Sequence, residues 1–176
     1  MRIELTCAAP ELDGRGARMI RKMAAASGCA LRKAAVLDVY LINGLEGFTP
    51  SVAADVFLDP VAQRMYLDEP GAPRILPDWN ILIEVTYRAG VANPEAHTAR
   101  EAVSRALTRE WEPSAIVQTA RQYAFVSENE PSSCAQKIAV LLYNPLIERA
   151  RIILRTVRQG FIDIAASYPH HVRVSQ

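Results

Sequence analysis

The chain contains an internal repeat, and this feature most restricts what it can fold into. Three landmarks appear in the same order in each half: RIELT (2–6), DVYL (38–41) and DPV (59–61), then LIEVT (82–86), RQYA (121–124) and NPL (144–146). The same order of strand and helix patterns lies between the landmarks, which is typical of a duplicated domain. The repeat therefore predicts a fused pair in one chain rather than a chance likeness between two amphipathic patterns.

Each half is predicted to be βαβαβ, and the first half has clear signals for this order. Alternating apolar and polar residues at the N-terminus indicate a strand with one buried face. Asp13 and Gly28 are suitable caps for the two ends of a helix. Within residues 34–42, the side chains that would point to each of the two faces of a strand are largely apolar, as in a strand buried on both faces. A Thr-Pro start at 49–50 predicts a short helix, and residues 61–67 a closing strand.

The second half repeats this order after a proline-containing segment. We expect strands at 81–87, 116–126 and up to residue 155, with helices at 93–108 and 132–143. The prolines of residues 68–78 predict a stiff, extended connector. The predicted organisation is a first repeat at 1–68, a linker at 69–79, a second repeat at 80–156 and a C-terminal tail at 157–176.

The predicted fold class is α+β, with two tandem ferredoxin-like halves, antiparallel sheets and the helices outside. If two helices cover only one face of each sheet, the other face is an exposed apolar surface. We therefore expect the halves to cover each other. The two long strands, which are apolar on both faces, should meet near a pseudo-twofold axis and form a pseudo-dimer within the chain.

Composition excludes several functional classes. Hydrophobic residues make up 50% and charged residues 22% of the chain, and no apolar run approaches the roughly 18 residues of a membrane helix. The N-terminus has no secretory signal pattern, so we expect a cytoplasmic protein. A net charge of +1 without a basic cluster argues against nucleic acid as a partner.

The three cysteines, Cys7, Cys29 and Cys134, are scattered and are expected to be reduced, partly buried thiols. Cys134 is the best candidate nucleophile, because a position near a helix N-terminus favours the thiolate. It shares a helix stripe with Ile138 and Leu141, however, so we expect it to be structural.

The sequence offers no convincing metal, phosphate or catalytic site. His97, His170 and His171 have no ligands at metal-binding spacing. The glycines at positions 14 and 16 lack the spacing of phosphate-binding loops. We therefore predict no catalytic residues, no metal and no cofactor in this chain.

The most distinctive motif runs from a predicted strand into a helix at residues 85–94 (VTYRAGVANP). Gly90 permits a sharp exit from the strand, and the Asn-Pro pair begins the helix. Together with VQTARQY at 117–123 and NPLIE at 144–148, this motif resembles PurS, the small subunit of phosphoribosylformylglycinamidine synthase. The likeness spans about residues 2–155 and is to the tandem form at the N-terminus of large single-chain synthases.

This resemblance implies a function in purine biosynthesis without catalysis by the chain itself. Such modules bridge the glutaminase and the ATP-dependent synthetase and support ammonia transfer during conversion of FGAR to FGAM. ATP, Mg and glutamine would belong to those partners. The resemblance predicts a partner interface at Arg88, Gly90, Asn93, Arg121 and Tyr123, with the two arginines as charged anchors.

The first half departs from the motif, because Ala8 and Pro10 stand where the second half has Arg88 and Gly90. Ala96 also replaces a glycine expected after the Asn-Pro start. Two other hypotheses stay open. The chain could be a tandem ferredoxin-like domain that binds a regulatory small molecule, since fold alone does not fix function, or an independent enzyme that uses Cys134.

Overall fold

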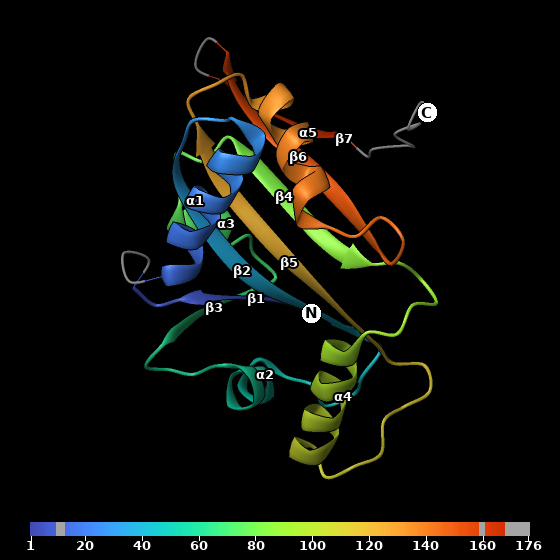
Figure 1. Ribbon diagram of the computed structural model, residues 1–176. Coiled ribbons are helices and arrows are strands. Elements are labelled where there is room, and N and C mark those ends of the chain that lie inside the picture. The colour runs from blue at the N-terminus through green and yellow to red at the C-terminus, as the bar shows by residue number, and fades with distance from the viewer. Residues whose placement is uncertain (10–12, 159–160, 168–176) are drawn as a thin grey trace.

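The computed structural model describes residues 1–9, 13–158 and 161–167, with side chains described up to Arg155. The chain forms a mixed α+β fold around one seven-stranded antiparallel sheet of order β3-β1-β2-β5-β4-β6-β7 (Figure 1). The strands are β1 (Arg2–Cys7), β2 (Leu31–Asn43), β3 (Gln63–Leu67), β4 (Ile81–Tyr87), β5 (Ile116–Ser127), β6 (Glu148–Arg158) and β7 (Phe161–Ser167). The helices are α1 (Gly14–Ser27), α2 (Pro50–Phe57), α3 (Ala72–Ile75), α4 (Pro94–Ala106) and α5 (Pro131–Leu142). No helix in the described ranges is long and apolar enough to cross a membrane.

The two long strands that are apolar on both faces, β2 and β5, pair at the centre of the sheet. Their antiparallel register runs from Leu31 opposite Ser127 to Asn43 opposite Ile116. The prediction that these strands meet is confirmed. They meet edge to edge, however, so the halves extend one sheet and do not cover each other as we expected. The strand order β3-β1-β2 in the first half is mirrored by β6-β4-β5 in the second.

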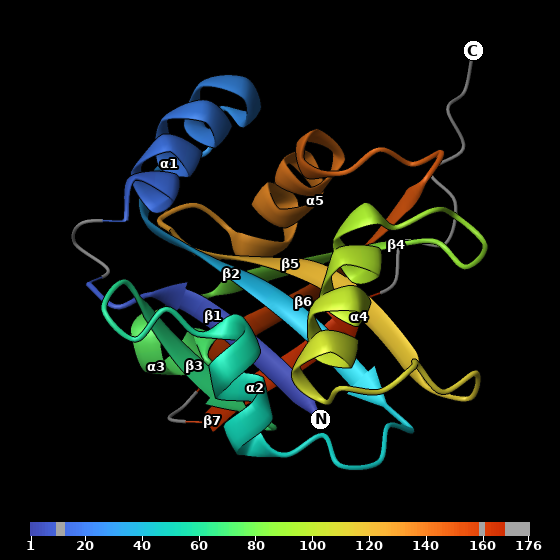
Figure 2. The same ribbon diagram turned by 90° about the horizontal axis from the view of Figure 1, so that it is seen from below.

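Four helices lie on one face of the sheet, in the pairs α1 beside α5 and α2 beside α4 (Figure 2). Each pair covers its own apolar cluster. The cluster under α1 and α5 includes Met23, Val36, Ile83, Tyr123, Phe125, Ile138 and Ile152. The cluster under α2 and α4 includes Ile3, Leu5, Ile42, Ala53 and Val103. The central strands are thus buried on this face by helices from both halves.

The predicted helix starts are confirmed by their caps. Asp13 accepts a hydrogen bond from the Arg15 N–H, and Thr49 and Asn93 cap α2 and α4 in the same way. Gly28 ends α1 in the left-handed conformation at φ 70°, where a glycine lacks the steric cost of a side chain. These signals are local, so the sequence alone could show them.

Helix α1 approaches β2 closely at Gly16, which makes this glycine a test of the packing. A Cβ at this position would lie 2.5 Å from the Ala34 carbonyl oxygen. We expect Gly16→Ala to lower the free energy of unfolding by about 1–3 kcal/mol in urea denaturation, as overpacking does. Gly14→Ala is the control, because nothing lies within 4 Å of its added Cβ. Equal stability of the two variants would contradict the close approach.

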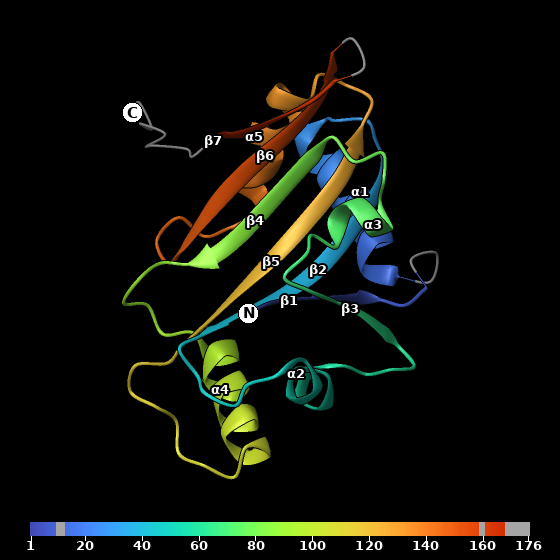
Figure 3. The same cartoon turned by 180° about the vertical axis from the view of Figure 1, so that it is seen from behind.

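The connector between the halves lies on the opposite face of the sheet and covers part of it (Figure 3). We expected residues 68–78 to be extended, but they contain α3, because Pro73 lies in its first turn, where a proline is compatible with a helix. Ala72, Leu76 and Trp79 are buried against apolar side chains of β2, β4 and β5. The connector is therefore part of the core.

A charged network lies on this same face and joins the halves. Arg2 of β1 forms ion pairs with Glu4 and with Glu84 of β4. Glu84 also accepts from Gln122 Nε2 at 2.8 Å, and Glu4 accepts from the Gly71 N–H at 2.7 Å. Because β1 and β4 are three places apart in the sheet, which is about 14 Å in a flat sheet, the Arg2 and Glu84 side chains reach toward each other across β2 and β5.

The predicted C-terminal tail, residues 157–176, contributes an additional strand. β7 pairs antiparallel with β6, from Phe161 opposite Arg158 to Ser167 opposite Ile152. The pair His170 and His171, considered above as metal ligands, lies outside the described residues.

Candidate functional site

The turn that carries the distinctive motif lies beside the turn between α5 and β6. The Arg88 N–H donates to the Ile147 carbonyl oxygen at 2.9 Å, and Arg88 Nε donates to the Glu148 carbonyl oxygen at 3.0 Å. Gly90 has a φ of 81°, so its backbone conformation favours glycine. Arg88 and Gly90 are both exposed. Two of the five predicted interface residues therefore lie on the surface at this end of the sheet.

Asn93 has a structural role in the same region. Its Oδ1 accepts from the Ala96 N–H at 3.0 Å and so caps α4. Its Nδ2 donates to Thr119 Oγ1 at 3.0 Å. The side chain thus ties the start of α4 to β5.

Arg121 belongs to a network of charged side chains at the centre of the face of the sheet that the four helices cover. Its guanidinium contacts Asp38 Oδ1 at 3.1 Å and Glu95 Oε1 at 3.0 Å. Asp38 Oδ2 also accepts from Arg15 Nη1 at 2.6 Å. These four side chains come from β5, β2, α4 and α1, so the network connects the two helix pairs across the junction of β2 and β5.

The electrostatics of this centre favour fixed protonation states. Burial tends to lower the pKa of Arg121, but the hydrogen bond and charge of Asp38 outweigh it and hold this pKa above its ordinary value. The pKa of Tyr123 is raised, chiefly by burial, although the positive charge of Arg121 opposes the shift. Arg121 is therefore charged and Tyr123 neutral near pH 7, and neither is poised to exchange a proton there.

Arg121 and Tyr123 both line a small cavity of about 110 Å³ between α4, α5 and the sheet. Its polar lining residues are Tyr87, Glu95, Thr119, Arg121, Tyr123 and Glu148. The Tyr123 side chain is only 7% exposed and packs in the cluster under α1 and α5. The five predicted residues therefore divide into an exposed pair, a helix cap and a pair at this cavity.

The structure adds an apolar surface that the sequence analysis missed. Leu146 is 83% exposed, and its neighbour Ile147, whose carbonyl oxygen accepts from the Arg88 N–H, is 40% exposed. We call Arg88, Leu146 and Ile147, which lie on the two neighbouring turns, the turn patch. Its sequence signal was the pair of apolar residues directly after the Asn-Pro start of the turn, where polar residues are more usual. A cluster of exposed apolar residues with polar neighbours is typical of a binding surface.

Arg149 of β6, which pairs with β4, provides a second positive charge close to Arg88. Arg149 is exposed, and its Nε donates a hydrogen bond to Thr86 Oγ1 at 2.9 Å. Arg88 and Arg149 form no ion pair with any residue in the described part of the chain. Their charges are thus available to an acidic partner.

The first half has the same turn geometry without the same side chains. The Ala8 N–H donates to the Ala62 carbonyl oxygen at 2.9 Å, as Arg88 does to Ile147. Val61 occupies the place of Leu146 and is 88% exposed. Ala8 provides no charge there, so the two ends of the sheet differ in their capacity to bind a partner.

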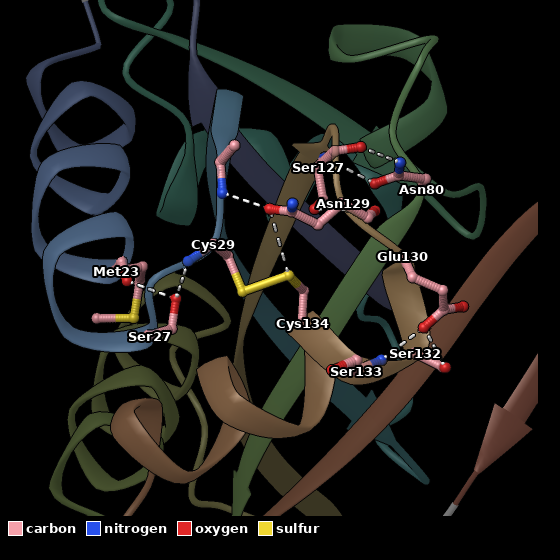
Figure 4. Close-up of a disulfide and its surroundings, with 11 residues drawn as sticks. Met23, Ser27, Cys29, Asn80, Ser127, Asn129, Glu130, Ser132, Ser133 and Cys134 are labelled. Carbon is pink, nitrogen blue, oxygen red and sulfur yellow. Dashed lines mark hydrogen bonds between the residues drawn. A yellow bond between two sulfur atoms is a disulfide. The ribbon is translucent and has the colours of Figure 1, made fainter.

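Cys134 is not a free thiol. It forms a disulfide with Cys29, which lies 105 residues earlier in the chain (Figure 4). The expectation of reduced thiols was therefore wrong for this pair, and a disulfide-bonded sulfur is not available as the nucleophile considered above. Within the described ranges, no group of three His, Cys, Asp or Glu side chains is arranged to hold a metal ion.

Comparison with known proteins provides no assignment, since no protein-family model and no curated protein matches the chain.

Proposed function

We propose that the chain is a non-catalytic, PurS-like component of phosphoribosylformylglycinamidine synthase in de novo purine biosynthesis. In this role it bridges the glutaminase and the ATP-dependent synthetase and supports ammonia transfer during conversion of FGAR to FGAM. The observation that carries the proposal is the pairing of β2 with β5 between two units of the same element order. This pairing is consistent with a subunit pair fused into one chain.

Matching contacts in the two halves support a tandem, ferredoxin-like duplication. The turn hydrogen bonds of Ala8 and Arg88 are equivalent, as described above. Glu4 and Glu84 occupy the same position in the repeat and bind the same Arg2 side chain. Such a junction holds two similar units in a fixed relation, which suits a module that positions other proteins.

The charged groups of the helix face favour a structural role over a catalytic one. Arg15 and Arg121 share the carboxylate of Asp38, and Arg121 also binds Glu95. These groups are satisfied by one another. Recognition of partners would then use the turn patch, where the apolar residues and the Arg88 guanidinium are exposed.

New negative charges in the turn patch test the proposed partner surface. We expect Leu146→Asp to weaken binding to the glutaminase and synthetase about 30-fold or more, because a central apolar contact contributes about 2 kcal/mol or more. Arg88→Glu is expected to weaken binding as well, with a strong dependence on salt. The measurement is titration calorimetry of the full chain with the two partner proteins from the same source, with glutamine and ADP present.

The first half provides matched controls for these variants. Val61→Asp and Ala8→Glu place the same charges in the equivalent turn, at positions related by the repeat. We expect them to leave binding unchanged. Equal weakening by both sets, or no weakening by the Leu146 and Arg88 variants, would rule out the turn patch as the partner surface.

A second function, binding of a regulatory small molecule, is favoured by the cavity of about 110 Å³. Glu148 offers a site for the ammonium group of a small amino acid, and the ligand's carboxylate would compete with Glu95 for the Arg121 guanidinium. A ligand that binds only the folded state raises the thermal midpoint. A saturable rise with small free amino acids, abolished by Glu148→Gln, would support this function over the first.

A further inference from the structure

The disulfide between Cys29 and Cys134 also joins the two halves, close to the end of the β2–β5 ladder where Leu31 lies opposite Ser127. Cys29 lies in the turn between α1 and β2, and Cys134 in the first turns of α5. Their Cα atoms are 6.0 Å apart, and each residue is only 3% exposed. Figure 4 shows the bond spanning from the end of α1 to the start of α5.

Hydrogen bonds hold the two turns together independently of the disulfide. The Glu128 N–H donates to the Ala30 carbonyl oxygen at 3.0 Å, and the Ala30 N–H donates to Asn129 Oδ1 at 2.6 Å. The Cys29 N–H also donates to Ser27 Oγ at 3.2 Å, which fixes the backbone beside the first sulfur. Reduction would therefore leave the two thiols near each other, ready to be oxidised again.

The surroundings of the sulfurs suit both the thiol and the disulfide. Met23, Ala135 and Ile138 belong to the apolar cluster that contains both cysteines. A free cysteine packs as a small apolar residue in such a place. Cys7 is separate from this pair and is the free cysteine among the described residues.

We propose that Cys29 and Cys134 form a reversible thiol–disulfide site that exchanges with small-molecule disulfides of the glutathione class. Local opening at the exposed start of α5 gives access to the buried sulfurs. The Cys134 thiolate attacks one sulfur of the small disulfide, so a mixed disulfide forms and one small thiolate leaves. The Cys29 thiolate then attacks the Cys134 sulfur, closes the protein disulfide and releases the second small thiolate.

The exchange balances without another reactant. The two protein thiols give up two protons and two electrons, and the small disulfide takes them up to become two small thiols. The reverse sequence restores the protein thiols. The fraction of protein in the disulfide form therefore depends on the ratio of small thiol to small disulfide. Oxidation links the turn after α1 covalently to α5. This inference is independent of the proposed function in purine biosynthesis.

The test is redox titration of the folded full chain in mixtures of reduced and oxidised glutathione. Acid quenching, alkylation of free thiols and peptide mass spectrometry would measure the fraction of linked Cys29 and Cys134. We expect a reversible transition in native buffer, with the thermal midpoint about 10 °C higher in the oxidised form, because the bond closes a loop of about 100 residues. The comparison is between the oxidised and the reduced wild-type protein, so it needs no variant.

Three variants make the result specific. Cys7→Ser is expected to titrate like the wild type, whereas Cys29→Ala and Cys134→Ala should lose the redox dependence of the thermal midpoint. A bond that is reduced only after unfolding by denaturant would overturn the proposal in favour of a permanent disulfide. Absence of the linked peptides at every glutathione ratio, or linkage through Cys7, would overturn it as well.

Discussion

Arg2→Met is expected to lower the free energy of unfolding by about 3–5 kcal/mol, the usual cost of removing one partner from a buried ion pair. Arg2 lies between Glu4 and Glu84, whose side chains are 2% and 12% exposed. Its loss would leave two carboxylates in a place with little water and without their shared positive charge. Urea denaturation at neutral pH would measure the effect.

Two controls separate the charge effect from the loss of packing. Arg18→Met removes an exposed arginine of α1 and is expected to change stability by less than about 0.5 kcal/mol. The triple variant Arg2→Met, Glu4→Gln, Glu84→Gln should regain most of the lost stability, because neutral groups replace the unpaired charges. If Arg2→Met is as stable as the wild type, the network does not hold the halves together.

Trp79→Ala is expected to destabilise the protein by about 3–5 kcal/mol, which is typical of a buried tryptophan. Trp79 is 4% exposed and packs with Leu82 and Ala124 on the face of the sheet that α3 covers. The Arg155 guanidinium also lies 5.8 Å from the centre of its ring. Removal of the ring would leave a cavity between the connector and the central strands. Thermal and urea denaturation would both measure this loss.

Trp79→Phe should cost less than half as much as Trp79→Ala. The Trp79 Nε1 atom has no hydrogen-bond partner in the described part of the chain, so a phenyl ring would lose volume but no hydrogen bond. Arg74→Ala is the control in the same connector, since its ion pair with Glu69 is exposed. If Trp79→Ala destabilises the protein no more than Arg74→Ala does, the connector does not contribute to the stability of the core.

The parts of the fold that were predictable from the sequence depend on local signals. The caps at Asp13, Thr49 and Asn93 act within one turn of the chain, so the helices that they begin were predicted correctly. Strands β2 and β5 were recognisable because they are apolar on both faces, which is unusual unless both faces are covered. Their pairing followed from the repeat.

The missed features depend on contacts between distant residues. The prolines of the connector predicted extension, because a four-residue helix has too little periodicity to show against them. Cys29 and Cys134 approach each other only after α1 and α5 pack side by side. The edge-to-edge junction could not be distinguished from stacked halves, since both arrangements bury the same alternating residues.

The candidate interface was predictable only in part. The exposed positions of Arg88 and Gly90 followed from the turn signals of the motif. The cavity beside Arg121 and the exposure of Leu146 required the tertiary arrangement of α4, α5 and the two neighbouring turns. An apolar residue in a turn can be buried or exposed, and its own neighbours in the sequence do not decide which.

The most direct test of the central claim is association of the full chain with its proposed partners. Size-exclusion chromatography with light scattering would use the glutaminase and synthetase from the same source, with glutamine and ADP present. We predict that all three proteins elute together as a complex of defined mass, and that Leu146→Asp releases this chain from it. Separate elution of the wild-type chain under these conditions would contradict the proposed function.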